Sequence, residues 1–219
     1  MATKRTLSEV QTLEMYRVSL ENVQNQPEIA SAMAELGYNP ETIEQGKALL
    51  AETRLAFDHN KIEDDESSAA YKAFANLKDQ LHELFTLHRK KAKVVFRNDT
   101  LAMDRLGVSG SMPKAYIKWL EAIKKFYSVA IADTDIQAKL ARLKVSPDQL
   151  ADANTLLSSI EAARAEYLRE KGESQDATKA KDAAFAKIDD WMSEFYAVAR
   201  IALDDKPQLL ESLGKVVRS

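Results

Sequence analysis

The chain has 219 residues, of which 45% are hydrophobic and 30% charged, and its formal net charge is −3. This balance is typical of a folded globular protein and excludes an intrinsically disordered chain. Cysteine is absent, which excludes disulfides, zinc–thiolate sites, iron–sulfur clusters and cysteine nucleophiles. Glycine and proline are few, and Ala, Leu, Glu and Lys are abundant, so we expect an all-α fold.

The first half of the chain is predicted to form three long helices and two short ones. Asn39 and Pro40 mark the start of one long helix, because Asn is a good N-cap and Pro fits the first helical position. The acidic stretch KIEDDES is expected to form a turn before the longest helix. In chain order, the helices cover about 6–25, about 27–36, a stretch from Pro40, about 66–97, and a segment that ends at a left-handed Gly107.

The second half repeats the first at an offset of 107 residues. LGYNPETIEQGKALL (36–50) aligns with LKVSPDQLADANTLL (143–157), and 14 of the 72 aligned positions from 36 to 107 are identical. Chance would give roughly four or five identities, so the sequence indicates a tandem duplication. We assign residues 1–108 to copy one and 109–219 to copy two, and the sequence leaves open whether the copies form one domain.

The helices of copy two are expected at the matching places. They cover about 111–131, about 133–143, a stretch from Pro147, about 174–204 after a REKGES turn, and a segment that ends at Gly214. On the longest of them, apolar residues recur at alternating spacings of three and four, which is the pattern of an antiparallel helical bundle. This predicted seam consists of Ala177, Ala180, Ala184, Ile188, Trp191, Phe195, Val198 and Ala202.

Two seam positions of copy one carry polar residues. His88 aligns with Phe195, and Lys91 aligns with Val198. A polar residue at a seam position either finds a partner or lies where the seam is open to water. We therefore take Glu83, His88 and Lys91 as candidate ligand-binding residues.

A metal site at these residues is not predicted. His82 and His88 are six residues apart, about 240° around a helix, so they do not share a face. A carboxylate-bridged di-iron bundle needs two Glu-x-x-His pairs, and the nearest match is a single Asp79-x-x-His82. The simpler interpretation is a solvated His82 and a hydrogen-bonded His88.

A basic patch is predicted around Arg89, Lys90, Lys93 and Arg97. The segment 88–125 contains ten Lys or Arg and three acids, a net charge of +7, so the rest of the chain carries −10. Nucleic-acid binding through this segment is an alternative. It is not favoured, because no known motif is present and copy two lacks the basic run. We expect a solvated helix edge that pairs with acidic groups, for example in a partner subunit.

Three stretches of copy two, EKGESQDATK, DDWMSEFYAVARIAL and DDKPQLLESLGKVVRS, together resemble a group of bacterial duplicated helical proteins of unknown function. The resemblance covers most of the chain, chiefly its second half. It implies a bacterial, all-helical, tandem architecture. It brings no catalytic residues to this chain.

These patterns favour a protein that acts through protein–protein contacts or self-association. No phosphate loop, nucleophile elbow or dinucleotide turn is present, so we expect no cofactor and assign no enzyme activity. A bundle enzyme that binds a metal or small ligand near His88 is the alternative. The stretch MATKRTLSEVQ lacks the apolar core of a signal peptide, and no run has the roughly 18 apolar residues of a membrane span. We therefore expect a cytoplasmic protein without membrane contact.

Overall fold

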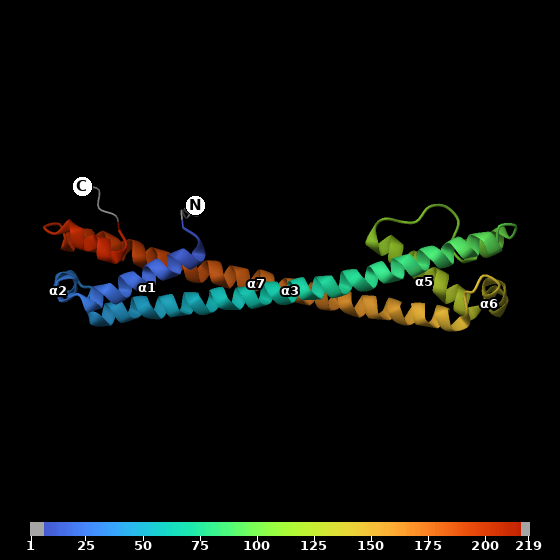
Figure 1. Cartoon of the computed structure of the whole chain (residues 1–219), viewed down its shortest axis with the longest axis horizontal. Helices are drawn as coiled ribbons and strands as arrows, with labels where there is room; N and C mark the ends of the chain where they lie inside the picture. Colours follow the sequence, from blue (N-terminus) through green and yellow to red (C-terminus); the bar gives the residue numbers. More distant parts are fainter. Residues whose placement is uncertain (1–6, 216–219) are drawn as a thin grey trace. The chain divides into compact units, whose positions relative to one another are not determined.

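The computed structural model describes residues 7–215, which form seven α-helices and one 3-10 helix, with no strand among them (Figure 1). The prediction of an all-α fold is confirmed. Residue 6, where the first helix was expected to begin, lies outside the described residues. In chain order the helices are α1 (Glu9–Asn25), α2 (Pro27–Glu35), α3 (Pro40–Val95), α4 (Thr100–Arg105), α5 (Tyr116–Ala132), α6 (Thr134–Ala141), α7 (Pro147–Ala202) and η1 (Pro207–Leu213).

Local sequence signals set the starts of the two longest helices. The Asn39 side chain accepts a hydrogen bond from the backbone N–H of Thr42 at 2.9 Å, so Asn39 caps α3 as predicted. At the start of α7, Ser146 and Gln149 exchange two side chain–backbone hydrogen bonds of 3.2 Å, which form a capping box. Such caps satisfy N–H groups that have no partner inside the helix, and each contributes about 1 kcal/mol.

The turns predicted within KIEDDES (61–67) and REKGES (169–174) are wrong. Both stretches are helical, so α3 and α7 each run without a break for 56 residues. Neither stretch contains proline, and Glu, Lys and Arg are good helix formers. A single glycine such as Gly172 costs only about 1 kcal/mol relative to Ala, too little to end a helix that is packed on both sides of it. Each half of the chain therefore has two long helices and not three.

Helix bounds recur at a fixed spacing along the chain. The first residues of α1, α2, α3 and α4 lie 107 positions before the first residues of α5, α6, α7 and η1. The helices α1 and α5 both have 17 residues. The last short segment of each half is followed by a left-handed glycine, with φ of 65° at Gly107 and 76° at Gly214, as predicted.

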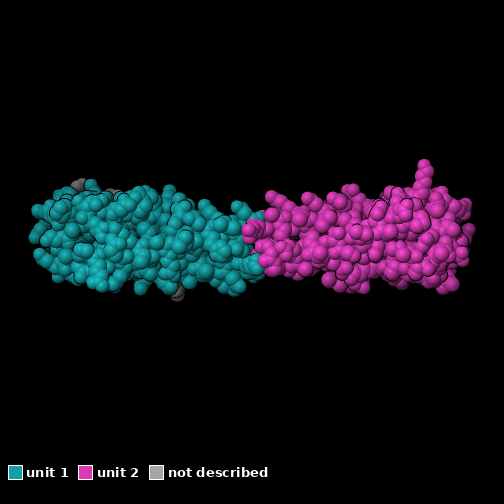
Figure 2. Space-filling view, turned by 90° about the horizontal axis from the view of Figure 1, so that it is seen from below, with its two compact units in different colours: residues 1–65, 172–219 teal, residues 66–171 magenta. Residues whose placement is uncertain are grey.

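The described residues form two compact units, coloured separately in Figure 2. Unit 1 covers residues 7–65 and 172–215, and unit 2 covers residues 66–171. The units do not coincide with the predicted copies 1–108 and 109–219, because α3 and α7 each contribute one part to either unit. Each unit therefore contains segments of both halves of the chain.

Unit 1 is built on α1, α2, η1, the first part of α3 and the last part of α7. Thr53 donates a hydrogen bond to the carbonyl oxygen of Ala184 at 3.2 Å, and the Asn60 amide donates to the Thr178 hydroxyl at 3.1 Å. From Thr53 to Asn60 the residue number rises along α3, while the number of the contacted residue falls from Ala184 to Thr178 along α7. The largest fully buried side chains of this core are Leu20, Ile29, Met33, Phe185 and Phe195.

The buried face of α7 in unit 1 is wider than the predicted seam. Ala180 of that seam is exposed. Four residues outside the seam are buried as well, because α7 packs against both α1 and α3. They are Phe185, Met192, Tyr196 and Ala199.

Unit 2 is built on α4, α5, α6, the last part of α3 and the first part of α7. Phe85 of α3 lies edge-on to Phe126 of α5, with ring centroids 5.5 Å apart. Phe74 stacks on Tyr167 of α7 at 6.2 Å. Burial of these rings, together with the aliphatic side chains around them, stabilises the folded unit. No helix among residues 7–215 is long and apolar enough to cross a membrane.

Candidate functional site

His88 lies inside unit 2, where only 1% of its surface is exposed. Its Nδ1 atom is 3.1 Å from the hydroxyl oxygen of Tyr127, and the two rings meet edge-on. Burial, and to a lesser extent the nearby Lys91 ammonium, lowers the pKa of His88 to about 4. The imidazole is therefore neutral at physiological pH and fully engaged in the core.

Of the three candidate ligand-binding residues, Lys91 lies near His88, whereas Glu83 lies apart from both. Glu83 is exposed on α3 and lies five residues from His88, which is about 140° around the helix. The Lys91 ammonium donates to the carbonyl oxygen of Lys144 at 3.3 Å, in the turn between α6 and α7. The three side chains therefore have different surroundings: solvent for Glu83, the core for His88 and the turn after α6 for Lys91.

Two cations of the predicted basic patch hold a loop in place. The Arg89 guanidinium donates to the carbonyl oxygens of Val108 and Gly110 at 3.0 and 2.9 Å. The Lys93 ammonium donates to the carbonyl oxygen of Gly110 at 3.1 Å. These cations satisfy the polar backbone of the segment after α4, which otherwise has few partners. Lys90 is exposed, with no hydrogen bond or ion pair to the rest of residues 7–215.

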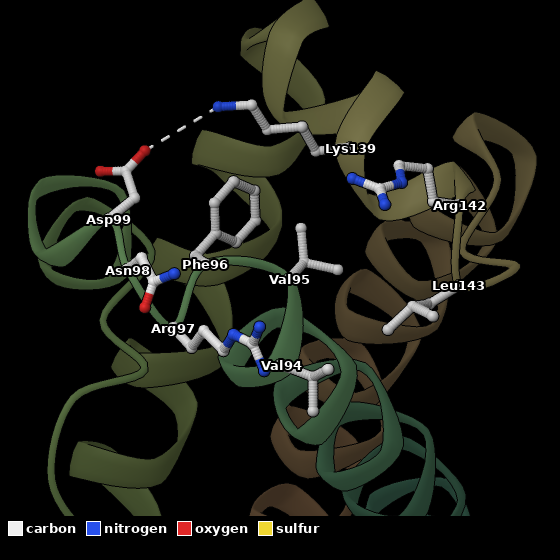
Figure 3. Close-up of a pocket in the computed structure, with 9 residues that line it drawn as sticks. All are labelled: Val94, Val95, Phe96, Arg97, Asn98, Asp99, Lys139, Arg142 and Leu143. Carbon is white, nitrogen blue, oxygen red and sulfur yellow. Dashed lines mark ion pairs between the residues drawn. The ribbon is translucent and has the colours of Figure 1, made fainter.

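A pocket of about 550 Å³ opens in unit 2 beside the fourth residue of that patch, Arg97 (Figure 3). One side comes from the end of α3 and the residues after it, and the other comes from the end of α6 and the turn that follows. The pocket is lined by Val94, Val95, Phe96, Arg97, Asn98, Asp99, Lys139, Arg142 and Leu143.

The pocket combines an apolar floor, formed by Val94, Val95 and Leu143, with cations, and Phe96 also lines it but is only 1% exposed. Figure 3 shows Val95 and Phe96 among the side chains of Arg97, Lys139 and Arg142. Lys139 lies 3.8 Å from the carboxylate of Asp99 and 5.6 Å from the centre of the Phe96 ring. Asp99 is itself occupied as the N-cap of α4.

Arg97 and Arg142 are the free cations of this pocket. Both are exposed, and neither makes a hydrogen bond or an ion pair within the part of the chain that the structure describes. A guanidinium presents two parallel N–H donors that match the two oxygens of a carboxylate or phosphate. Beside apolar side chains, such a pair is less screened than in open water. The pocket can therefore bind an anionic group that has apolar neighbours.

The sequence predicted only Arg97 of these cations. Lys139 and Arg142 lie more than 40 positions further along the chain, outside the basic segment 88–125 that the sequence marks. Lys139 lies in the last turn of α6, and Arg142 begins the turn between α6 and α7. Only packing of that turn against the end of α3 assembles the pocket.

Comparisons of the chain with models of protein families, with curated proteins and with solved structures find no match. The resemblance to bacterial duplicated helical proteins thus stays a prediction. The function has to be inferred from the geometry of this chain's own residues.

Proposed function

We propose that this protein acts through protein–protein contacts, and that the unit 2 pocket binds an acidic, partly apolar segment of a protein. The observation that carries the proposal is the pair of unpaired guanidinium groups, Arg97 and Arg142, beside the apolar side chains of Val94 and Val95. Arginine next to buried apolar surface is the usual composition of an interface centre.

The pocket is large enough for side chains of a partner surface. Its volume of about 550 Å³ accommodates a few of them, although it also lies within the range of small-molecule pockets. The exposed Val94, which is 60% accessible, extends the apolar area beyond the rim. A partner carboxylate would pair with a guanidinium while an adjacent apolar side chain covers Val94 or Val95.

The proposed architecture is an antiparallel helical bundle that arose by tandem duplication. The 107-residue spacing of the helix bounds supports duplication. The contacts of Thr53 with Ala184 and of Asn60 with Thr178 support opposite chain directions for α3 and α7 in unit 1. After a duplication the two copies can diverge, and the polar His88 opposite Phe195 is one such difference.

Nucleic-acid binding through the segment 88–125 is less well supported. Five of its ten cations already hold partners within unit 2. They are Arg89, Lys91, Lys93, Arg105 and Lys124. Cations that bind carbonyl or carboxylate oxygens of their own chain contribute little to phosphate binding, which depends on free positive charge.

The proposal is tested with a short fluorescein-labelled peptide of alternating glutamate and leucine. Fluorescence polarisation with the full chain should show binding at low salt that weakens as salt is raised, because screening shortens the Debye length from about 10 Å at 0.1 M to about 3 Å at 1 M. The variant Arg97→Asp/Arg142→Glu should lose the binding.

A matched control separates the pocket from general positive charge. Lys114 and Lys118 are exposed cations of the same unit without hydrogen bonds or ion pairs in the described chain. The variant Lys114→Glu/Lys118→Glu has the same change of net charge and should bind the peptide like the unmodified protein. Equal loss in both variants, or no binding by the unmodified chain, would contradict the proposal.

A further inference from the structure

A surface of opposite charge lies in unit 1 at the positions that match the unit 2 pocket. The 107-residue spacing relates each pocket residue to one residue of unit 1. Arg97 corresponds to Asp204, and Arg142 corresponds to Glu35. The full matching set, which we name the acidic surface, is Ala32, Glu35, Leu36, Ile201, Ala202, Leu203, Asp204, Asp205 and Lys206.

The charges of the two sets are inverted. The nine pocket residues include three cations and one acid, a net charge of +2, and the nine residues of the acidic surface include three acids and one cation, a net charge of −2. Each set also contains one cation with a partner, because Lys139 pairs with Asp99 and Lys206 pairs with Glu28 of α2. Arg97 and Arg142 of the pocket take part in neither ion pair.

The carboxylates of the acidic surface in unit 1 also lack partners. Glu35, Asp204 and Asp205 are exposed and make no side-chain hydrogen bond or ion pair with any residue from 7 to 215. The ion pair of Lys206 with Glu28 ties the segment after α7 to α2. Glu35 at the end of α2 and the two aspartates after α7 therefore belong to one end of unit 1 (Figure 1).

Apolar side chains accompany the charges on both surfaces. Val94 is 60% exposed beside the pocket, and the matching Ile201 is 69% exposed. Leu36 of the acidic surface is 46% exposed, whereas the matching Leu143 lines the pocket. Exposed Ile and Leu next to carboxylates are the chemistry that a pocket with cations and an apolar floor can accept.

We infer that the partner of the unit 2 pocket is the acidic surface of a second copy of this chain. The inference rests on the proposed function and names its partner. Asp204 and Glu35 of one copy pair with Arg97 and Arg142 of the other, and Ile201 or Leu36 covers the apolar floor. The contact is heterologous, because two different surfaces meet. Once two copies are joined, one pocket and one acidic surface are still unoccupied, and they can bind further copies unless the assembly closes into a ring.

The test is sedimentation velocity of the full chain from low to high micromolar concentration, at low and at high salt. The unmodified protein should associate in a concentration-dependent manner and dissociate as salt is raised. Variant A, Arg97→Asp/Arg142→Glu, makes both surfaces acidic. Variant B, Glu35→Arg/Asp204→Arg, makes both surfaces basic. Each variant alone should associate about tenfold or more weakly than the unmodified chain.

Mixing the variants provides the decisive readout. Equal amounts of A and B should associate again, because an acidic surface of A then meets a basic surface of B. A variant that had merely failed to fold would not be rescued in this way. The control variant Lys114→Glu/Lys118→Glu should associate like the unmodified chain.

Two results would overturn the inference. One is an unmodified chain that stays monomeric at high micromolar concentration and low salt. The other is self-association that variants A and B leave unchanged, or that their mixture fails to restore. In either case, retained binding of the glutamate–leucine peptide by the pocket would show that the proposed function stands and that the partner is another protein. Loss of both would reject the two together.

Discussion

The Nδ1 atom of His88 and the hydroxyl group of Tyr127 form a hydrogen-bonded pair of 3.1 Å inside unit 2. Both side chains are almost completely buried, with 1% and 0% of their surfaces exposed. His88 of α3 matches Phe195 of α7 at the 107-residue offset. In unit 1 this position therefore makes apolar contacts, and in unit 2 it makes a hydrogen bond. A polar residue is tolerated there because the partner hydroxyl satisfies it.

The buried imidazole makes stability depend on pH. Burial lowers the pKa of His88 from 6.5 to about 4 in the folded chain. Between these values the unfolded chain binds a proton that the folded chain does not, so the free energy of unfolding falls as pH falls from about 6.5 to about 4. We expect His88 to contribute a loss of about 2 kcal/mol, measured by urea denaturation at a series of pH values.

The control for this pH dependence is the variant His88→Phe/Tyr127→Phe, which has no titrating group at the site. Carboxylates elsewhere titrate equally in both proteins, so the difference between the two curves isolates His88. Identical curves would show that the imidazole is protonated in the folded state as readily as in the unfolded one.

Removal of one member of the pair should cost more than removal of both. Tyr127→Phe leaves the His88 Nδ1 atom buried without its partner, which we expect to lower the free energy of unfolding by about 1–3 kcal/mol. The double variant with phenylalanine at both positions should recover part of this loss. A double-mutant cycle by chemical denaturation measures the coupling, and additive losses would argue against the hydrogen bond.

Two helical glycines should respond to alanine with opposite signs. A Cβ atom on Gly46 of α3 would clash with the ring of Trp191, which is held by stacking on Phe195 at 5.6 Å. Gly46→Ala should therefore destabilise the protein by about 1–3 kcal/mol. A Cβ atom on Gly172 of α7 meets nothing within 4 Å, so Gly172→Ala should stabilise it by about 0.5–1 kcal/mol.

The Gly172 variant also tests the continuity of α7. If residues 169–174 formed the turn that the sequence suggests, alanine would gain nothing from helix propensity. Thermal unfolding of both variants gives the signs. A lower melting temperature for Gly172→Ala, or an unchanged one for Gly46→Ala, would contradict the packing described.

The Ser19 hydroxyl links three segments of unit 1. It lies 2.7 Å from the Tyr196 hydroxyl of α7, and it is 2.9 Å from the carbonyl oxygen of Leu213 in η1. Ser19→Ala should cost about 1–3 kcal/mol and speed amide hydrogen exchange in η1, because two buried groups lose their partner. Ser128→Ala, at an exposed hydroxyl bound to the Lys125 carbonyl, should change stability by less than about 0.5 kcal/mol.

Continuity of the long helices could not be read from the sequence. Acidic and glycine-containing stretches occur in turns and in solvated helices alike, and no local signal separates the two at KIEDDES. Tertiary contacts decide, because side chains on both sides of the stretch pack on neighbouring helices and stabilise an uninterrupted backbone. The pocket could not be read either, since Arg97 and Arg142 come together only through packing of α3 against the turn after α6.

The sequence by itself determined the all-α class, the helix starts at Asn39 and Ser146, and the left-handed glycines at 107 and 214. These features depend on capping hydrogen bonds and backbone dihedral angles, which act within one helical turn. Only the tertiary structure decided that His88 is buried, that α3 and α7 each run through both units, and that Arg97 meets Arg142. Burial and charge clustering depend on which distant segments touch, and the residues of one segment alone do not carry that information.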